Sequence, residues 1–213
     1  MIGRRGFLLG LAAAPIASTA KGQLSEPRTE EVRKFRKLLG APSSLIVAAR
    51  QQIGVTVTYD PAYISLNYPG GDIDRSKGVC TDVIVRAYRD AFDYDLQQAI
   101  HEDMTTNFSD YPDIWGLTRP DKNIDHRRVP NIETFLKRGG YELPTDRWYT
   151  GDLITCRIDG RLPHIGIVAT ESRGLFPFNQ AQRVIHNIGG GTREERVIGL
   201  YKNERRFRFF PYA

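Results

Sequence analysis

The sequence predicts an α+β fold in which helices come first and a run of short strands follows. Apolar residues recur at helical spacing before Gly139 and alternate with polar residues after Asp152. The chain has 213 residues, of which 40% are hydrophobic and 26% are charged, as in ordinary globular proteins. Helices followed by consecutive strands favour an antiparallel sheet, within a single domain that we place at residues 29–213.

The first twenty residues have the pattern of an export signal. Arg4 and Arg5 precede a short apolar run that ends in small residues at Ala20. The run is too short to span a bilayer, and the arginine pair before Gly-Phe-Leu resembles a twin-arginine signal, which exports folded proteins. A Sec signal with a chance arginine pair, or an uncleaved anchor, is the alternative. We expect removal of residues 1–20, a polar linker at 21–28 and a periplasmic or secreted protein without stable membrane insertion.

The helices expected before Gly139 are delimited by acidic residues, proline and glycine at their ends. They are Thr29–Leu39, which ends at Gly40, then Pro42–Gln52, the helix that begins at Cys80, Asp95–Met104 and Pro130–Arg138. Strand character is expected at Val55–Thr58 and Tyr63–Leu66. The turn-rich segment Asn107–Val129 is too long for a simple connection, so we expect it to be functional.

Strands are expected to make up the rest of the chain. They are Leu153–Ile158, His164–Ala169, Arg183–Ile188, Arg196–Tyr201 and Phe207–Pro211.

Cys80 is expected at the first turn of an amphipathic helix. Apolar residues follow it at helical spacing, so the sulfur should face inward, whereas Asp82 and Arg86 should lie on a solvated opposite face. The N–H groups and dipole at a helix start favour a thiolate, the form of cysteine that attacks carbonyl groups. A cysteine packed in the core, or one half of a disulfide with Cys156, is the alternative.

A thiol nucleophile needs a base and a group that orients the base. Among the four histidines, His164 opens a strand on which Gly166 shares its face and would let a helix or substrate approach. His186 and Asn187 follow on the next strand. Because they point to opposite faces, only one of them can orient His164, and the pattern leaves this choice open.

A second group of chemically active side chains lies between the cysteine and His164. It consists of His101, Glu102, Asp103, Asp125 and His126, residue types that bind divalent metals. Their spacing matches no metal signature, and a hydrogen-bonded loop network is the alternative, so we expect neither a metal nor a cofactor. The adjacent Arg127 and Arg128 could contact a carboxylate of a substrate.

The order of motifs resembles that of the NlpC-type papain-like cysteine peptidases, which cut bacterial cell-wall peptides. The matching motifs are Tyr68-x-Gly70-Gly71, Gly78-x-Cys80, Gly151-Asp152-Leu153 and His164-Ile165-Gly166-Ile167. The resemblance implies a papain-like fold with Cys80 as nucleophile, His164 as base, His186 as the favoured orienter and Tyr68 assisting the oxyanion. The chain departs from this pattern at Val79 and Thr81-Asp82, which flank the cysteine.

Longer strings resemble a bacterial exported family catalogued as domain of unknown function 1287. They include Gly78-Val79-Cys80-Thr81-Asp82-Val83, Tyr111-Pro112-x-x-Trp115-Gly116 and Asn123-Ile124-Asp125-His126-Arg127-Arg128. The insertion between Cys80 and His164, which holds the His101–Asn131 segment, is expected to shape a substrate groove. The expected substrate-binding residues are Asp82, His101, Asp103, Trp115, Asp125, His126, Arg127 and Asn187.

We expect an exported cysteine hydrolase that cleaves an amide bond in peptidoglycan or its peptide fragments. The formal net charge of +5 is compatible with an anionic cell-wall surface. Basic residues are scattered and match no nucleic-acid-binding motif, so nucleic acid is not an expected partner. The alternatives are a catalytically silent wall-binding module with a Cys80–Cys156 disulfide, a metal-dependent hydrolase that uses the His101–His126 segment, and a thiol enzyme acting on another acyl substrate.

Overall fold

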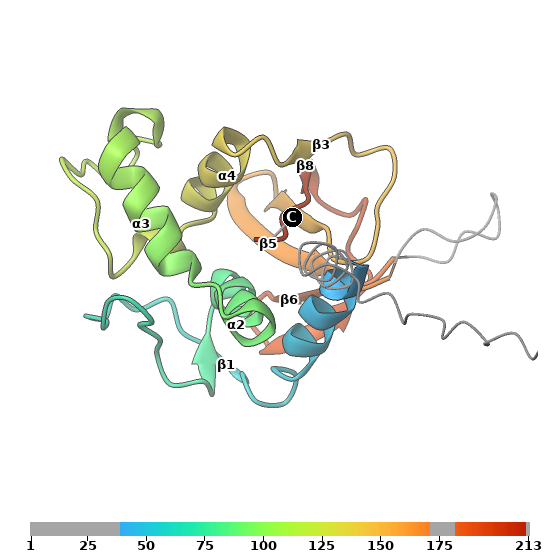
Figure 1. Ribbon diagram of the computed structural model, residues 1–213. Coiled ribbons are helices and arrows are strands. Elements are labelled where there is room, and N and C mark those ends of the chain that lie inside the picture. The colour runs from blue at the N-terminus through green and yellow to red at the C-terminus, as the bar shows by residue number, and fades with distance from the viewer. Residues whose placement is uncertain (1–38, 171–181, 212–213) are drawn as a thin grey trace, which may run out of the picture.

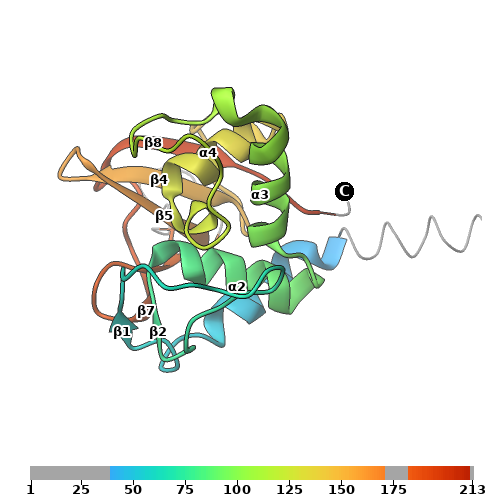
Figure 2. The same cartoon turned by 90° about the vertical axis from the view of Figure 1, so that its left-hand side faces the viewer.

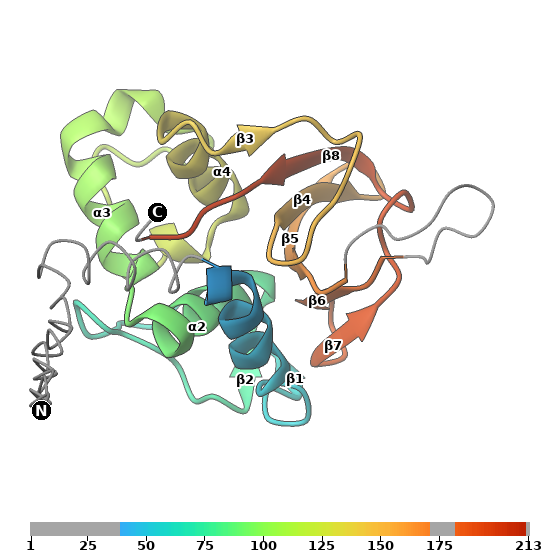
Figure 3. The same cartoon turned by 45° about the vertical axis from the view of Figure 1, so that its right-hand side comes forward.

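Apolar stripes on the helices meet alternating apolar residues of a six-stranded sheet. Figure 1 shows the arrangement of these helices and strands. The computed structural model describes residues 39–170 and 182–211. The expected signal, the linker and most of the Thr29–Leu39 helix therefore lie outside the described residues. The α+β class is confirmed, with the helices on one side and the sheet on the other (Figure 3).

The described helices all precede the main part of the sheet. They comprise residues 39–50, α2 (Cys80–Phe92), α3 (Leu96–Asn107) and α4 (Val129–Arg138), with short 3-10 turns η1 (Phe108–Asp110) and η2 (Asp125–Arg127). Helix α3 begins where the Asp95 carboxylate accepts the N–H of Gln97. Figure 2 shows α3 and α4 above α2, with the short strands β1 (Thr58–Tyr59) and β2 (Lys77–Gly78) below it.

The main sheet is antiparallel throughout. Its strands are β3 (Glu142–Leu143), β4 (Leu153–Ile158), β5 (Leu162–Val168), β6 (Val184–Asn187), β7 (Thr192–Glu195) and β8 (Lys202–Phe207). They lie in the order β3-β8-β4-β5-β6-β7. The short strands β1 and β2 pair separately and in parallel, so that Tyr59 lies opposite Gly78, two residues before Cys80.

Both faces of the sheet are covered by apolar side chains. Ile165, Ile167 and Ile185 join the larger core, which includes the buried residues of α2. Val168 and Val184 join a smaller cluster with Trp148. Since successive strand residues point to opposite faces, the side chains of His164 and His186 leave the sheet on the face away from α2.

The predicted solvated face of α2 is wrong for Asp82 and Arg86, although Asp90 near the end of the helix is exposed. Arg86 is 1% exposed, and its guanidinium contacts the carboxylate of Asp72 at 2.7 Å. Asp82 is also buried and pairs with Arg127 at 3.0 Å. These partners lie outside the helix, so helical spacing alone could not reveal that the charges are buried and paired.

Several predicted boundaries also differ from the structure. The helix at 39–50 continues through Gly40, and the residues from Tyr63 to Leu66 form no strand. The strand predicted at Arg196–Tyr201 is wrong, because β7 and β8 flank that segment. The strand predicted at Phe207–Pro211 overlaps β8 only at Phe207. The predictions for α4, β4, β5 and β6 agree with the structure to within two residues at each end, and α2 begins at Cys80 as predicted.

No helix in the described ranges has both the length and the apolar character needed to cross a bilayer.

Replacing Arg86 with methionine is expected to lower the free energy of unfolding by about 3 kcal/mol or more. The guanidinium also donates to main-chain carbonyl groups of Ile73 and Lys77, so its loss leaves several acceptors and the Asp72 carboxylate without a partner. Urea unfolding followed by circular dichroism measures the effect. Arg75→Met is the control, because Arg75 pairs with Asp90 on the surface and should contribute less than about 1 kcal/mol. Equal losses in the two variants would contradict this account of the buried pair.

Candidate active site

Cys80 is the first residue of α2 and lies at the wall of a cleft of about 360 Å³. The cleft is also lined by aromatic, basic and apolar side chains, among them Tyr59, Trp115, Arg127, Arg128, Val129 and Pro163. The thiol itself is almost fully buried, with 4% of the residue exposed. The structure thus places the predicted cysteine at a helix start and beside a concave surface.

Burial raises the pKa of the Cys80 thiol to about 11. The backbone N–H groups of Ile165, Thr81 and Cys80 itself hydrogen-bond to the sulfur and act in the opposite direction, whereas the nearby charge of Asp82 raises the pKa further. The thiol is therefore protonated in the resting protein at neutral pH. A nucleophilic role requires a base that removes this proton during attack.

His164 and His186 form a buried hydrogen-bonded pair. His164 Nε2 lies 2.8 Å from His186 Nδ1, and neither residue is more than 4% exposed. Burial, together with the neighbouring His186, lowers the pKa of His164 to about 3, so the imidazole is neutral near pH 7. The two residues that the sequence left open are thereby distinguished, because His186, and not Asn187, contacts His164.

Asn187 has a different role at the same end of β6. Its amide donates to the carbonyl of Gly78 at 3.0 Å, which ties the strand to the chain just before Cys80. Gly166 also differs from expectation. A Cβ at this position would collide with the Val184 side chain, so the glycine admits the neighbouring strand rather than a helix or substrate.

Glu195 approaches the second nitrogen of His186, with Oε2 lying 3.3 Å from Nε2. A carboxylate accepts hydrogen bonds only, so it favours a proton on His186 Nε2 and leaves Nδ1 as an acceptor. His164 must then donate from Nε2, which leaves Nδ1 as its basic atom. Sequence reasoning did not identify Glu195, although its position in β7, two residues from the partner of His186, follows from the strand register.

The sulfur and the imidazole pair come together through the main chain of β5. Pairing of β5 with β6 is confined to Ile167 with Ile185 and Val168 with Val184. Beyond the pair of Ile167 with Ile185, toward the start of β5, the N–H of Ile165 hydrogen-bonds to the Cys80 sulfur. The sulfur is thus next to the peptide unit that follows His164, although the imidazole leaves the strand on the far face. No direct contact between Cys80 and either imidazole is present among the described residues.

Tyr68, the predicted oxyanion residue, does not line the cleft. Its ring packs edge-on against His101, with centroids 4.9 Å apart. Tyr59 lines the cleft instead, and its pKa is raised by burial and by the nearby Cys80 and Asp82, so its hydroxyl stays protonated. The sequence offered no signal that separates the two tyrosines, because Tyr59 reaches the site only through the pairing of β1 with β2.

Three of the predicted substrate-binding residues have their polar atoms engaged by partners within the protein. Asp82 accepts the N–H of Val79 and pairs with Arg127. Arg127 also donates to the carbonyl groups of Asp60 and Ala62. Asp103 accepts from the Tyr111 hydroxyl at 2.5 Å and pairs with Arg138. The contacts of Arg127 hold that wall of the cleft in place, and the internal contacts of all three side chains leave few free donors or acceptors for a ligand.

His101 and His126 do not assemble the predicted acidic residues into a metal site. In the ranges that the structure describes, no three His, Cys, Asp or Glu side chains are placed to share an ion. His126 is 3% exposed, and burial lowers its pKa to about 4. The Nδ1 atoms of both histidines are buried and have no hydrogen-bond partner in the described part of the chain.

The disulfide of the wall-binding alternative is absent, because Cys80 and Cys156 are both free and buried. Cys156 lies on β4 directly opposite His164. Burial raises its pKa to about 12. Cys156 is not among the residues that line the cleft, so the two thiols have different access to a ligand.

Comparison with known proteins finds a matching family and a bacterial relative. The family described as "Domain of unknown function (DUF1287)" matches residues 46–209. The chain is 42% identical over 209 residues to "Uncharacterized protein YijF" of Escherichia coli strain K12, which covers 95% of this chain and 96% of the relative.

Alkylation of Cys80 is expected to accelerate with pH between about pH 6 and pH 10, because only the thiolate reacts and the pKa of the buried thiol is raised to about 11. Iodoacetamide labelling of the Cys156→Ser variant, with the modified peptide quantified by mass spectrometry, measures the rate. A rate that is already level across neutral pH would show instead a thiolate paired with an imidazolium.

The proton positions of the histidine pair are expected to follow Glu195. Long-range ¹H–¹⁵N correlation spectra should show His164 and His186 each protonated on Nε2. Glu195→Gln keeps an acceptor and should preserve this pattern, whereas Glu195→Lys presents a donor and should shift the His186 proton to Nδ1. Finding His164 protonated on Nδ1 in the unaltered protein would contradict the predicted arrangement.

Proposed function

Since this chain belongs to the family described as Domain of unknown function (DUF1287), we propose from the geometry of its site that it is a cysteine hydrolase that cleaves an amide bond. The observation that carries the proposal is the thiol of Cys80, at the start of α2 and in a cleft, one peptide unit from a hydrogen-bonded histidine pair. Cys80 is the nucleophile, His164 the base and His186 the residue that orients it.

In the proposed reaction, the Cys80 sulfur attacks the carbonyl carbon while its proton passes to His164 Nδ1. The imidazolium gives that proton to the leaving amine as the C–N bond breaks, which leaves a thioester on the sulfur. Water then attacks the thioester, and its proton returns through His164 to the thiol. The proposed reaction requires a local rearrangement of β5 that turns the His164 and His186 imidazoles together toward the sulfur, because both now leave the sheet on the far face and rotation of the His164 side chain alone would break its hydrogen bond to His186.

The negative oxygen of the tetrahedral intermediate needs hydrogen-bond donors. The Cys80 backbone N–H lies at the helix start, where the helix dipole also favours negative charge. Tyr59, a protonated hydroxyl in the same cleft, is a better-placed donor than Tyr68. We therefore assign the oxyanion role proposed for a tyrosine to Tyr59.

The finer fold assignment and the substrate are parts of the same proposal. A cysteine helix packed on an antiparallel sheet, with histidines on two adjacent strands, supports a papain-like fold of the NlpC type. Peptidoglycan peptides, which hold amide bonds and free carboxylates, suit a cleft lined by arginine and aromatic side chains. The expected export signal supports a substrate in the periplasm or beyond.

One observation favours a second candidate, a wall-binding module without catalysis. The imidazole pair faces away from α2, and burial leaves the thiol protonated and the histidine neutral. In that case the cleft binds a cell-wall peptide and the thiol is only a packing group. The two candidates differ in whether bonds are broken.

Cys80→Ala is expected to reduce muropeptide hydrolysis by at least about a thousandfold, because the nucleophile is removed. Liquid chromatography with mass spectrometry of digested muropeptides measures the products. Cys156→Ala is the matched control, since it removes a buried thiol that does not line the cleft and should retain activity. His164→Gln should resemble Cys80→Ala.

Each alternative outcome has a defined meaning. Equal hydrolysis by the Cys80→Ala variant and the unaltered protein would exclude the thiol as nucleophile. Binding of muropeptides without cleavage by any variant would favour the wall-binding module.

A further inference from the structure

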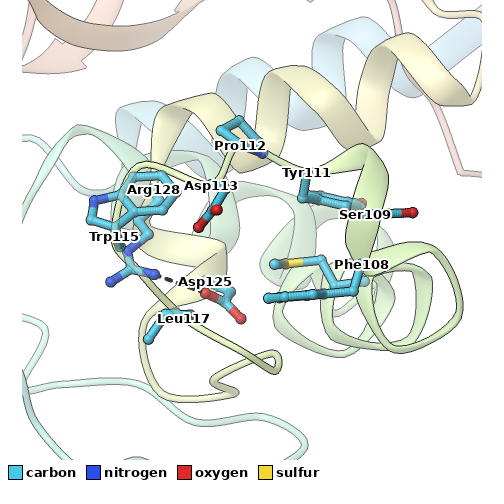
Figure 4. A pocket seen from close by; sticks show the side chains of 10 residues that line it. Phe108, Ser109, Tyr111, Pro112, Asp113, Trp115, Leu117, Asp125 and Arg128 are labelled. Carbon is cyan, nitrogen blue, oxygen red and sulfur yellow. Dashed lines mark hydrogen bonds and ion pairs between the residues drawn. The ribbon is translucent and has the colours of Figure 1, made fainter.

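A second cavity, of about 240 Å³, is shown in Figure 4, and it shares Trp115 and Arg128 with the Cys80 cleft. Its walls come from the end of α3, η1 and the segment that leads to α4. They are mostly apolar or aromatic and include Met104, Phe108, Tyr111, Pro112 and Leu117. The insertion between the cysteine and His164 thus builds a cavity next to the thiol cleft, which the proposed reaction does not use.

Trp115 and Arg128 line both cavities and form the wall between them. The Arg128 guanidinium lies 4.1 Å from the centre of the Trp115 ring, so the two side chains are stacked. The indole is 36% exposed, and therefore presents an open surface at this boundary.

The two arginines of the cleft differ in their free donors. Arg127 uses every guanidinium nitrogen for Asp82 or for main-chain carbonyl groups. Arg128 bonds to Asp125 through Nη1 at 3.1 Å, and its Nε and Nη2 atoms have no such partner within the described ranges. A guanidinium held on one side by a carboxylate and on one face by an aromatic ring is oriented, and it retains donors for a second anion.

The charges around Arg128 determine on which side an anion can bind. The second cavity is also lined by Asp113 and Asp125, which repel an anion there. Among the described residues, those that line the Cys80 cleft include Arg127 and Arg128 but no acidic side chain. A carboxylate is therefore favoured on the cleft side of Arg128, while the neighbouring cavity suits an uncharged apolar group.

We propose that Arg128 and Trp115 form a subsite for a peptide with a free carboxylate, whose adjacent apolar side chain enters the second cavity. Arg128 binds the carboxylate on the cleft side, and Trp115 contacts the peptide at the boundary. This subsite extends the proposed hydrolase function by naming the feature that selects the substrate. Binding at Arg128 needs no thiol chemistry, so it can be measured separately from hydrolysis.

Tryptophan fluorescence of the Cys80→Ala variant tests the subsite. The chain has two tryptophans, and Trp148 is 4% exposed on the other face of the sheet, so a ligand-dependent change reports Trp115. The probe is N-acetyl-alanyl-leucine, and its C-terminal amide is the control ligand. The acid is expected to bind at least about tenfold more tightly than the amide, because only the acid carries a charge for Arg128.

Variants then locate the effect. Arg128→Gln should abolish the preference for the acid, and Arg128→Lys should retain part of it because the charge remains without the planar fork. Arg50→Gln is the matched control, since Arg50 also pairs with one carboxylate, that of Glu194, but lies outside both cavities. It should bind the acid as the parent variant does.

Equal affinity for the acid and the amide in the parent variant would overturn the subsite, and this comparison needs no mutation at Arg128. An acid preference that survives Arg128→Gln would also overturn it. If the acid binds as expected but muropeptides are not cleaved by the protein with Cys80 intact, the subsite stands and the hydrolase proposal fails.

Discussion

The cleft depends on the hydrogen bond and the ion pair that the Asp82 carboxylate makes. It accepts the N–H of Val79 at 2.7 Å and so fixes the start of α2 and the position of Cys80. The same group pairs with Arg127, whose other nitrogens bind the carbonyl groups of Asp60 and Ala62. One buried ion pair therefore joins the cysteine helix, η2 and the segment after β1. Removing either partner would leave a buried charge without compensation.

This pair also decides which side chains are free to bind a ligand. Because Arg127 is committed to internal partners, it supports the cleft, and the neighbouring Arg128 remains available. With the proposed subsite, structural and recognition roles would be separated between two adjacent arginines. Trp115 adds an apolar surface beside the free guanidinium, which gives the insertion a defined function in the proposed substrate site.

The sheet explains why the Cys80 sulfur lies beside the main chain that follows His164 but does not contact the imidazole. Strand alternation sends Ile165 toward α2 and His164 to the far face. Where the pairing of β5 with β6 ends, the sulfur accepts the N–H of Ile165. Burial keeps both the thiol and the imidazole neutral, so in the proposed mechanism charge develops only when a proton moves between them.

The sequence by itself determined the elements whose signals are local. The cysteine at the start of α2, strand β4 and the two histidine strands follow from periodicity and from capping residues that lie within a few positions. Tertiary structure alone decided which polar groups are buried and with whom they pair. Asp82 pairs with Arg127, which is 45 residues away in the sequence. Tyr59, and not Tyr68, lines the cleft. Glu195 of β7 lies beside His186 of the paired strand β6. The physical reason is that helical and strand spacing reflects neighbours in sequence, whereas the burial of a charge depends on a partner supplied by the folded chain.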